Sequence, residues 1–432
     1  MHIFRPRASR RRGKPAAPSG GCGDRSLSEA ASARYQRGLM SILFLIVFVD
    51  LVGFGLVIPL LPFYAERFGA SPVAMTALFA TYSLMSMVTA PLWGRLSDRV
   101  GRRPVLMVSM AAAALAYGWL GLATRLWMVF AARAFAGACA GNIAAAQAYI
   151  ADITTPENRA RGMGMIGAAF GLGFIIGPVI GGVVAGSNIA TADLETPGLI
   201  AAGMSLTAFL GVVLLLPESR QAGRELAARS RIAALRAALA IPMLARLLAV
   251  FFLVILAFSG METTFAWWAI AQFGWGPRPT GFVFFYVGLL SALMQGGLIG
   301  PLTRRLGEER LMLGGLALIA VGLLVMPFAR ALPLLIVALS ALAFGMGAMQ
   351  PSINSLISRR AGSERQGEVM GVAQSVGSLA RVVGPLVAGW LFTEFGRSSP
   401  FLWGAALVVA ALLFGWRLLR AVAPPLPLHP AK

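Results

Sequence analysis

The sequence predicts an all-α membrane protein with twelve transmembrane helices arranged as two six-helix halves. Of its 432 residues 58% are hydrophobic and 12% are charged, whereas soluble domains carry about 25% charged residues. A bilayer core about 30 Å thick needs roughly 20 apolar helical residues, and twelve stretches are long enough. Sequence landmarks that recur about 206 residues apart predict the two halves. Short alternating segments, typical of membrane β-barrels, are not visible.

The spans follow from apolar runs between charged or Pro/Gly-rich breaks, and these runs are too apolar all round for soluble helices. The first six lie near 40–63, 74–95, 104–123, 126–150, 162–186 and 198–216. The second six lie near 246–270, 279–300, 311–329, 332–357, 366–391 and 399–419. The resulting organisation is a tail (1–38), a first half (39–216), a central loop (217–245), a second half (246–420) and a C-terminal tail (421–432).

The distribution of arginine predicts the orientation. The loops after even-numbered spans hold Arg95, Arg99, Arg102, Arg103, Arg159, Arg161, Arg220, Arg224, Arg229, Arg231, Arg236, Arg304, Arg305, Arg310, Arg359, Arg360 and Arg365. The alternate loops hold mostly single arginines, so the positive-inside rule places both termini in the cytoplasm. The net charge of +20 then reflects topology and attraction to lipid headgroups. Nucleic-acid binding is the rival interpretation, but the charge is scattered over loops, and we expect no nucleic-acid partner.

The first 38 residues differ from the rest in composition. They are rich in Arg, Ser, Gly and Pro and have no apolar core before Leu39, so they are not a cleavable secretory signal. We expect a disordered basic tail, or an extension upstream of a true start at Met40. A mitochondrial transit peptide has a similar composition and stays open as an alternative. Cys22 and Cys139 are poorly placed to pair, and neither a disulfide nor a metal framework is expected.

An internal repeat relates the two halves. Glycine landmarks pair as Gly94 with Gly300, Gly164 with Gly371, and Gly177 with Gly384, at offsets of 206 or 207 residues. Six-span halves of this kind are related by an axis along the membrane normal, and the substrate binds between them near mid-bilayer. The repeat therefore predicts a transporter.

The loop between spans 2 and 3 carries a specific motif. It reads Gly94-Arg95-Leu96-Ser97-Asp98-Arg99-Val100-Gly101-Arg102-Arg103 and resembles the loop hallmark of the major facilitator superfamily. Glycine at 94 permits close helix packing, and Gly101 permits a tight turn. The resemblance implies a charge lock of Asp98 and Arg102 with Asp152 that holds the cytoplasmic gate shut. The candidate gate residues are Gly94, Asp98, Arg99, Gly101, Arg102 and Asp152. In the alternative, the arginines are only topology anchors.

Span 5 contains a glycine-proline pattern, Gly171-Leu-Gly-Phe-Ile-Ile-Gly-Pro-Val-Ile-Gly-Gly. Gly173, Gly177 and Gly181 form one small face for close helix contact. Pro178 leaves a backbone carbonyl free and bends the helix. The pattern resembles the signature of proton-driven antiporters in the same superfamily. Packing without an antiport role is the alternative.

A closer resemblance, over roughly 40–395, is to bacterial tetracycline-resistance efflux proteins and their multidrug relatives. The matching runs include Asp50-Leu-Val-Gly-Phe-Gly-Leu-Val-Ile-Pro-Leu-Leu-Pro, Ala148-Tyr-Ile-Ala-Asp-Ile-Thr, Leu214-Leu-Leu-Pro-Glu-Ser and Val383-Gly-Pro-Leu. The tetracycline exporters carry an acidic residue in span 3 and another in span 9, and both are absent here. The resemblance therefore implies export of amphipathic compounds, with tetracycline itself outside the expectation.

Four charged residues lie within the apolar spans: Asp50, Arg133, Glu262 and Arg381. A charge at mid-membrane costs at least about 2.5 kcal/mol, so such residues usually face a cavity and serve function. Asp50 lies about ten residues, hence roughly 15 Å, into span 1, and Arg133 resembles the antiporter-associated arginine of the superfamily. We expect an Asp50–Arg133 interaction, with Glu262 and Arg381 as the acid and base of the other half. Two static pairs that fix helix register are the alternative.

Polar and aromatic side chains in the spans suggest the substrate cavity. The candidates are Gln147, Phe265, Trp268, Gln295, Gln350 and Asn354. A nucleotide-binding loop and hydrolase or metalloprotease motifs are absent, so we expect neither an enzyme nor a cofactor beyond the proton gradient. The sequence predicts a proton-coupled antiporter of small amphipathic or drug-like compounds, monomeric, in a bacterial inner membrane. A proton-linked metabolite importer, or a sensor or scaffold without transport, are the alternatives.

Overall fold

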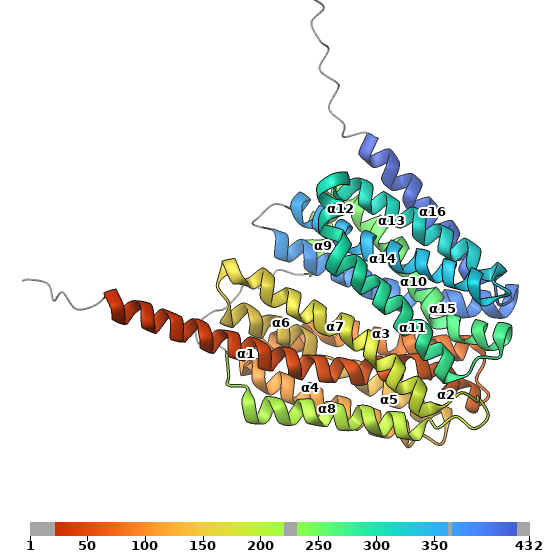
Figure 1. The fold of residues 1–432 in the computed structure, drawn as a ribbon, viewed down its shortest axis with the longest axis horizontal. Helices are drawn as coiled ribbons and strands as arrows, with labels where there is room; N and C mark the ends of the chain where they lie inside the picture. Colours follow the sequence, from red (N-terminus) through yellow and green to blue (C-terminus); the bar gives the residue numbers. More distant parts are fainter. Residues whose placement is uncertain (1–21, 220–230, 362–364, 421–432) are drawn as a thin grey trace, which may run out of the picture.

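The computed structural model describes residues 22–219, 231–361 and 365–420, and these residues form helices joined by short loops (Figure 1). The first half contains α1 (Cys22–Val57), a short turn of helix (Ile58–Leu60), α2 (Leu61–Arg67), α3 (Pro72–Val100), α4 (Arg102–Gly121), α5 (Leu126–Ala138), α6 (Asn142–Ile153), α7 (Pro156–Ala185) and α8 (Glu195–Leu215). The second half follows α9 (Arg231–Leu239) and contains α10 (Pro242–Phe273), α11 (Pro277–Leu293), α12 (Ile299–Leu306), α13 (Glu308–Val325), α14 (Leu332–Ala361), α15 (Gln366–Phe395) and α16 (Ser399–Arg420). Within the described ranges, twelve segments are long and apolar enough to span a membrane, as predicted.

The first helix begins earlier than expected. The sequence predicts a disordered tail over 1–38, whereas α1 begins at Cys22, so the prediction is wrong for 22–38. This segment contains three Ala and three Arg, which favour helix, and extending an existing helix costs less than starting one. Residues 1–21, the arginines of 220–230 and the tail from 421 lie outside the described residues.

Spans 1, 4 and 8 are interrupted, and span 1 passes from α1 to α2 through the turn Ile58–Leu60. Span 4 divides into α5 and α6 at Cys139–Gly141. Span 8 continues from α11 into α12 through a wide helical turn, Met294–Leu298, which contains Gln295. Wide turns of this kind are frequent at functional sites, and broken helices in transporters commonly lie near the substrate.

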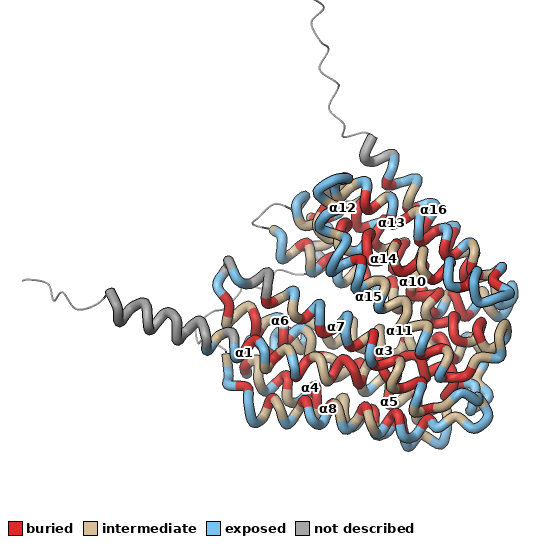
Figure 2. The backbone as a smooth tube through the Cα atoms, in the orientation of Figure 1, coloured by how far each residue is buried: buried red, intermediate tan, exposed pale blue. Residues whose placement is uncertain are grey.

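The packing follows the sequence repeat. In the first half α1 packs against α7 and α8, and α4 packs against α8; in the second half α10 packs against α15 and α16, and α13 against α16. Buried residues, most of them apolar, lie on the inward-facing sides of the helices in each half (Figure 2). The second half has one large core that includes Leu316, Ile319, Leu342, Met349 and Phe401. Each half is therefore a packed unit with its own core.

The two halves touch at one end of the bundle, through α7 with α11 and α3 with α15. There the backbone N–H of Arg278 donates to the carbonyl of Gly186 at 3.0 Å. The indole of Trp267 donates to the carbonyl of Pro62 at 3.2 Å. At the same end Asp193, just before α8, accepts a hydrogen bond from the Thr196 N–H. Hydrogen bonds from the side chain and then the backbone of Thr196 lower the pKa of the Asp193 carboxyl. We call this the closed end.

The arginine-rich end, which carries the loops at 95–103, 304–310 and 359–365, is open between the halves. One stripe of α7 contacts α11 at Ile175, Pro178 and Gly182, but a side-chain atom added at Gly164 or Gly171 would meet nothing within 4 Å. In Figure 1 the halves meet toward the right of the view and separate toward the left. The helices thus diverge from mid-bundle toward the arginine-rich end.

Candidate transport site and loop network

Asp50 lies on α1 near the middle of the first span, Gly38–Arg67, where it is 3% exposed. One carboxylate oxygen accepts a hydrogen bond of 2.5 Å from the side-chain amide of Asn142. The other accepts 2.8 Å from the hydroxyl of Ser205 on α8. Both oxygens of this buried acid are thus bound by uncharged donors, which compensate part of the cost of burying the charge.

The break in span 4 positions Asn142. Because the chain leaves the helix at Cys139–Gly141, its free backbone groups need partners. The Trp93 indole donates to the Ala138 carbonyl at 2.7 Å, and the Gly141 N–H donates to the Ser109 hydroxyl at 3.1 Å. Asn142 then begins α6, so that its amide reaches Asp50. A helix N-terminus favours a negative charge nearby, and this adds to the stabilisation of the carboxylate.

Arg133 does not pair with Asp50, and the predicted interaction is wrong for this conformation. The guanidinium lies over the ring of Tyr82, 4.4 Å from its centre, and the residue is 3% exposed. Its Nε has no hydrogen-bond partner among the described residues. The physical reason is that Asn142 and Ser205 bind the Asp50 oxygens while an aromatic face receives the cation.

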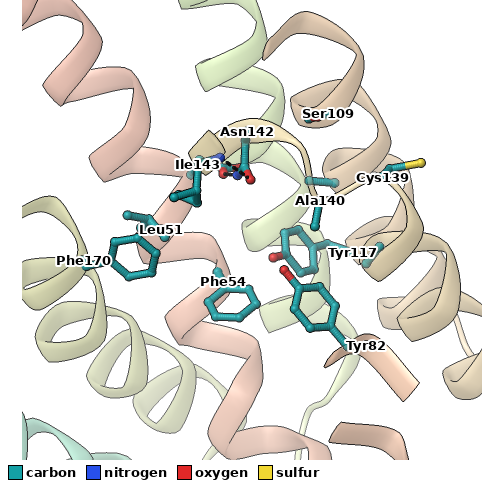
Figure 3. Close-up of a pocket in the computed structure, with 13 residues that line it drawn as sticks. Leu51, Phe54, Tyr82, Ser109, Tyr117, Cys139, Ala140, Asn142, Ile143 and Phe170 are labelled. Carbon is teal, nitrogen blue, oxygen red and sulfur yellow. Dashed lines mark hydrogen bonds between the residues drawn. The ribbon is translucent and has the colours of Figure 1, made fainter. Parts of the chain in front are cut away.

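A cavity of about 70 Å³ lies beside Asp50, within the first half (Figure 3). Its lining includes Phe54, Tyr82, Tyr117 and Phe170, and the two phenol hydroxyls point into it. A single water needs about 10–15 Å³ on this measure, so the cavity holds several waters or a small head group. Sequence reasoning missed both tyrosines, although the chain contains only six tyrosines and these two lie in spans 2 and 3.

The second half contributes Glu262 on α10 and Arg381 on α15, both half-buried. Arg381 interacts electrostatically with Glu262, but the described residues show no direct salt bridge between them. Tyr82 is within electrostatic reach of Asp50 and Arg133 in its own half and of Arg381 in the other. Three of the four charges predicted from the sequence therefore interact with Tyr82, and the fourth, Glu262, interacts with Arg381.

Two predicted cavity residues are core residues instead. Phe265 is 2% exposed and Trp268 is 0% exposed. Phe265 packs edge-on to Phe284 at 6.1 Å, and Trp268 to Phe401 at 5.5 Å. Both fill the interior of the second half, so the prediction that they line the substrate cavity is wrong.

The predicted polar cavity residues lie elsewhere. Gln147, Gln295 and Gln350 are exposed and Asn354 is half-buried. They are absent from the lining of the cavity beside Asp50. Contact with substrate from these four side chains stays a prediction.

The loop motif forms the expected ion pairs. Arg102 donates to Asp98 at 2.5 Å and to Asp152 at 2.9 Å. The Glu218 carboxylate, which sequence reasoning missed, accepts from the backbone N–H groups of Arg102 and Arg103 at 2.9 and 3.2 Å. Arg102, Arg103, Asp98 and Asp152 belong to the first half and Glu218 to the start of the central loop, so in this conformation the network does not reach the second half. A gating role stays a prediction.

The two motif glycines differ. Gly101 has φ of +110°, and a side chain there would also meet the Glu218 carboxylate, so glycine is required twice over. Gly94 has open space around it within 4 Å. The prediction that Gly94 permits close helix packing is wrong here, because α3 has no neighbour beside Gly94 in this conformation. Arg99, the remaining motif residue, is exposed.

The glycine-proline pattern of span 5 has the predicted close contact. A side-chain carbon added at any of the three glycines would lie too close to α1. At Gly173 it would lie 2.9 Å from Leu51, at Gly177 2.6 Å from the backbone of Val52 and Leu56, and at Gly181 2.5 Å from Leu56. The carbonyl of Pro178 faces Gly281 of α11 in the other half. The helix α7 therefore joins α1 within its half to α11 across the halves.

Two repeated six-helix halves that meet at one end, with buried charges and a cavity between helices, define a membrane transporter rather than an enzyme. The chain belongs to the Major Facilitator Superfamily, whose family model matches residues 43–385 and, in an overlapping second match, 296–432.

Relatives cover most of the chain. Tetracycline resistance protein, class C, of Escherichia coli is 33% identical over 85% of this chain and 92% of its own length. Multidrug resistance protein 2 of Bacillus subtilis (strain 168) is 29% identical over 88% and 95%. The crystal structure of the human organic anion transporter MFSD10 is 28% identical, covers 88% of this chain and 99% of its own, and superposes with a TM-score of 0.66.

Proposed function

We propose that this protein is a proton-coupled exporter of small amphipathic compounds in a bacterial inner membrane. The observation that carries the proposal is Asp50, a buried mid-span acid bound only by Asn142 and Ser205, beside a cavity. A carboxylate held by uncharged groups takes up or releases a proton without breaking an ion pair. The tetracycline-resistance and multidrug-resistance relatives support export.

The conformation supports an alternating-access mechanism. The halves are in contact at the closed end and apart at the arginine-rich end. If the positive-inside rule holds, the arginine-rich end is cytoplasmic, and this is the inward-facing state. Rocking of the halves about α7–α11 and α3–α15 would close the arginine-rich end and open the other.

The proton gradient is sufficient as a driving force. A gradient of about 200 mV corresponds to about 4.6 kcal/mol per proton, at about 2.3 kcal/mol per 100 mV. At about 1.4 kcal/mol per decade, one proton supports roughly a thousandfold outward gradient.

The proposal is tested by dye accumulation in a pump-deficient bacterial strain that expresses the protein. We expect lower accumulation of lipophilic dyes, restored to the level of the empty strain by a protonophore. ATP depletion with the proton gradient maintained should leave efflux unchanged. Efflux that stops on ATP depletion alone would overturn proton coupling. Proton-driven uptake of a compound into the cell would favour the alternative function, a proton-linked metabolite importer.

A further inference from the structure

Two hydrogen-bond donors point into the cavity beside Asp50 and have no partner. Tyr117 is 5% exposed, and its hydroxyl is directed into the cavity, as is that of Tyr82 (Figure 3). Within the described part of the chain neither hydroxyl donates to a protein group. Because both hydroxyls face the cavity and no described protein group occupies them, they are available to a ligand.

A positive charge lies behind the two phenols. Arg133 lies against the face of Tyr82 and has an unpartnered, fully buried Nε. It interacts electrostatically with both Tyr82 and Tyr117. A buried cation without an anion is costly, and a ligand anion bound by the two hydroxyls would supply the missing negative charge.

The opposite wall of the cavity is acidic. Asp50 lines the same cavity, and both tyrosines interact electrostatically with it as well as with Arg133. Each Asp50 oxygen accepts one hydrogen bond and has a further lone pair. The tyrosines therefore lie between a fixed acid and a fixed base. A ligand with only a negative charge would be repelled by Asp50, and one with only a positive charge would leave the donors unused.

The cavity is small but adjoins a larger space. At about 70 Å³ it takes a head group rather than a drug-sized body, which needs a pocket of about 300–1,000 Å³. Phe54 and Phe170 line it and both pack against Phe174. Gly171, next to Phe170, faces the open space between the halves. The aromatic wall thus leads from the cavity to that space.

We propose that this cavity binds the head group of a zwitterionic aromatic compound, with a carboxylate on the Tyr82 and Tyr117 hydroxyls and an ammonium group on Asp50. The charge of Arg133 stabilises the carboxylate from behind, and the aromatic body packs along Phe54 and Phe170. This inference rests on the proposed export function and names its substrate class. The ammonium group competes with a proton for Asp50, as an antiporter requires.

The test is equilibrium binding to the purified full-length protein, by isothermal titration calorimetry without a proton gradient. The three probes share an indole body: L-tryptophan is zwitterionic, tryptamine lacks the carboxylate, and indole-3-propionate lacks the amine. We expect L-tryptophan to bind at least about tenfold more tightly than either analogue, because a hydrogen bond to a charged group is among the stronger ones. Equal or tighter binding of tryptamine would overturn the proposal.

Two variants assign the two ends of the ligand. Tyr117→Phe should weaken L-tryptophan and indole-3-propionate about tenfold and leave tryptamine within about twofold. Asp50→Asn should weaken L-tryptophan and tryptamine and spare indole-3-propionate. Tyr286→Phe is the matched control, because its hydroxyl pairs with Ser340 in the second half, and it should change none of the three. Uniform weakening of all probes by Tyr117→Phe would overturn the assignment, even if Asp50→Asn does not fold.

The proposed binding site and the proposed export function can be overturned independently of each other. Selective L-tryptophan binding without gradient-driven efflux would overturn the proposed function and leave this site assigned. Dye efflux without discrimination among the three probes would overturn the site alone.

Discussion

Arg102, the first residue of α4, donates a hydrogen bond of 2.9 Å to Asp152 near the end of α6. The same position in the second half carries the opposite charges, because Glu308 begins α13 and pairs with Arg359 near the end of α14 at 3.2 Å. These residues lie 206 and 207 positions after their counterparts. Each half therefore has its own ion pair at the arginine-rich end, with the charges exchanged.

The loop network predicts a transport defect without a binding defect. Asp98→Asn removes one partner of Arg102, and we expect slower efflux with unchanged substrate affinity, because the network is remote from the cavity. Asp98 is 54% exposed, so thermal stability should change little. Efflux rate and substrate affinity are measured in parallel, and Asp193→Asn at the closed end is the control. A wild-type efflux rate would reduce the motif arginines to topology anchors.

Close packing of α7 on α1 predicts a position-specific effect of glycine. A side-chain carbon at Gly177 would lie 2.6 Å from backbone atoms of Gly55 and Leu56. We therefore expect Gly177→Ala to destabilise the protein by about 1–3 kcal/mol, as overpacking does. Gly167→Ala is the matched control on the same helix, since nothing lies within 4 Å of it. It should be neutral or slightly stabilising.

Thermal unfolding of the purified protein in detergent compares the two variants. Equal unfolding temperatures would contradict the α1–α7 contact.

Glu262 requires a revised prediction. The sequence predicts that Phe265 and Trp268, one and two helical turns after Glu262, line the substrate cavity. Because Phe265 and Trp268 are buried in the core of the second half, that aromatic site is absent. We now expect Glu262→Gln to reduce efflux of cationic and neutral compounds alike, through its electrostatic interaction with Arg381.

The ratio of cationic to neutral dye efflux measures this outcome, with Glu394→Gln near the end of α15 as the control. Selective loss of cationic substrates would contradict this expectation and assign Glu262 to the recognition of cationic substrates.

The sequence predicts the spans and misses features that depend on tertiary contacts. Apolar length alone predicts one helix over 126–150, but the break at Cys139–Gly141 depends on Ser109 and Trp93, which lie in other spans. Period and hydrophobicity cannot tell which face of α10 is buried, because the helix is apolar all round. For this reason the sequence predicts Trp268 in the substrate cavity, although it packs in the core of the second half.

The predicted pairing of Asp50 with Arg133 is wrong for a related reason. Asp50 and Arg133 are the two ionisable residues in the spans of the first half, and sequence reasoning pairs them because each needs compensation. Uncharged groups provide that compensation instead: Asn142 and Ser205 for the acid, and the Tyr82 ring for the base. Hydroxyl, amide and aromatic partners carry no charge signal, so the pattern of charges does not reveal them.

Replacing the Asp50 carboxylate with an uncharged amide should uncouple transport from the proton gradient. Asp50→Asn keeps the shape of the side chain and its hydrogen bond with Ser205, but it removes the group that exchanges a proton. We expect gradient-driven efflux to be lost, while exchange of labelled for unlabelled substrate across the membrane continues. An indole-3-propionate-type anion suits this exchange assay, because its binding does not require the Asp50 charge. Both reactions are measured in proteoliposomes, with and without an imposed proton gradient.

Ser205→Ala is the companion variant, because it removes one donor to Asp50 and keeps the acid. It should retain coupled efflux at a reduced rate. If Asp50→Asn still drives uphill efflux, the coupling proton binds elsewhere, and Glu262 is then the next acid to test.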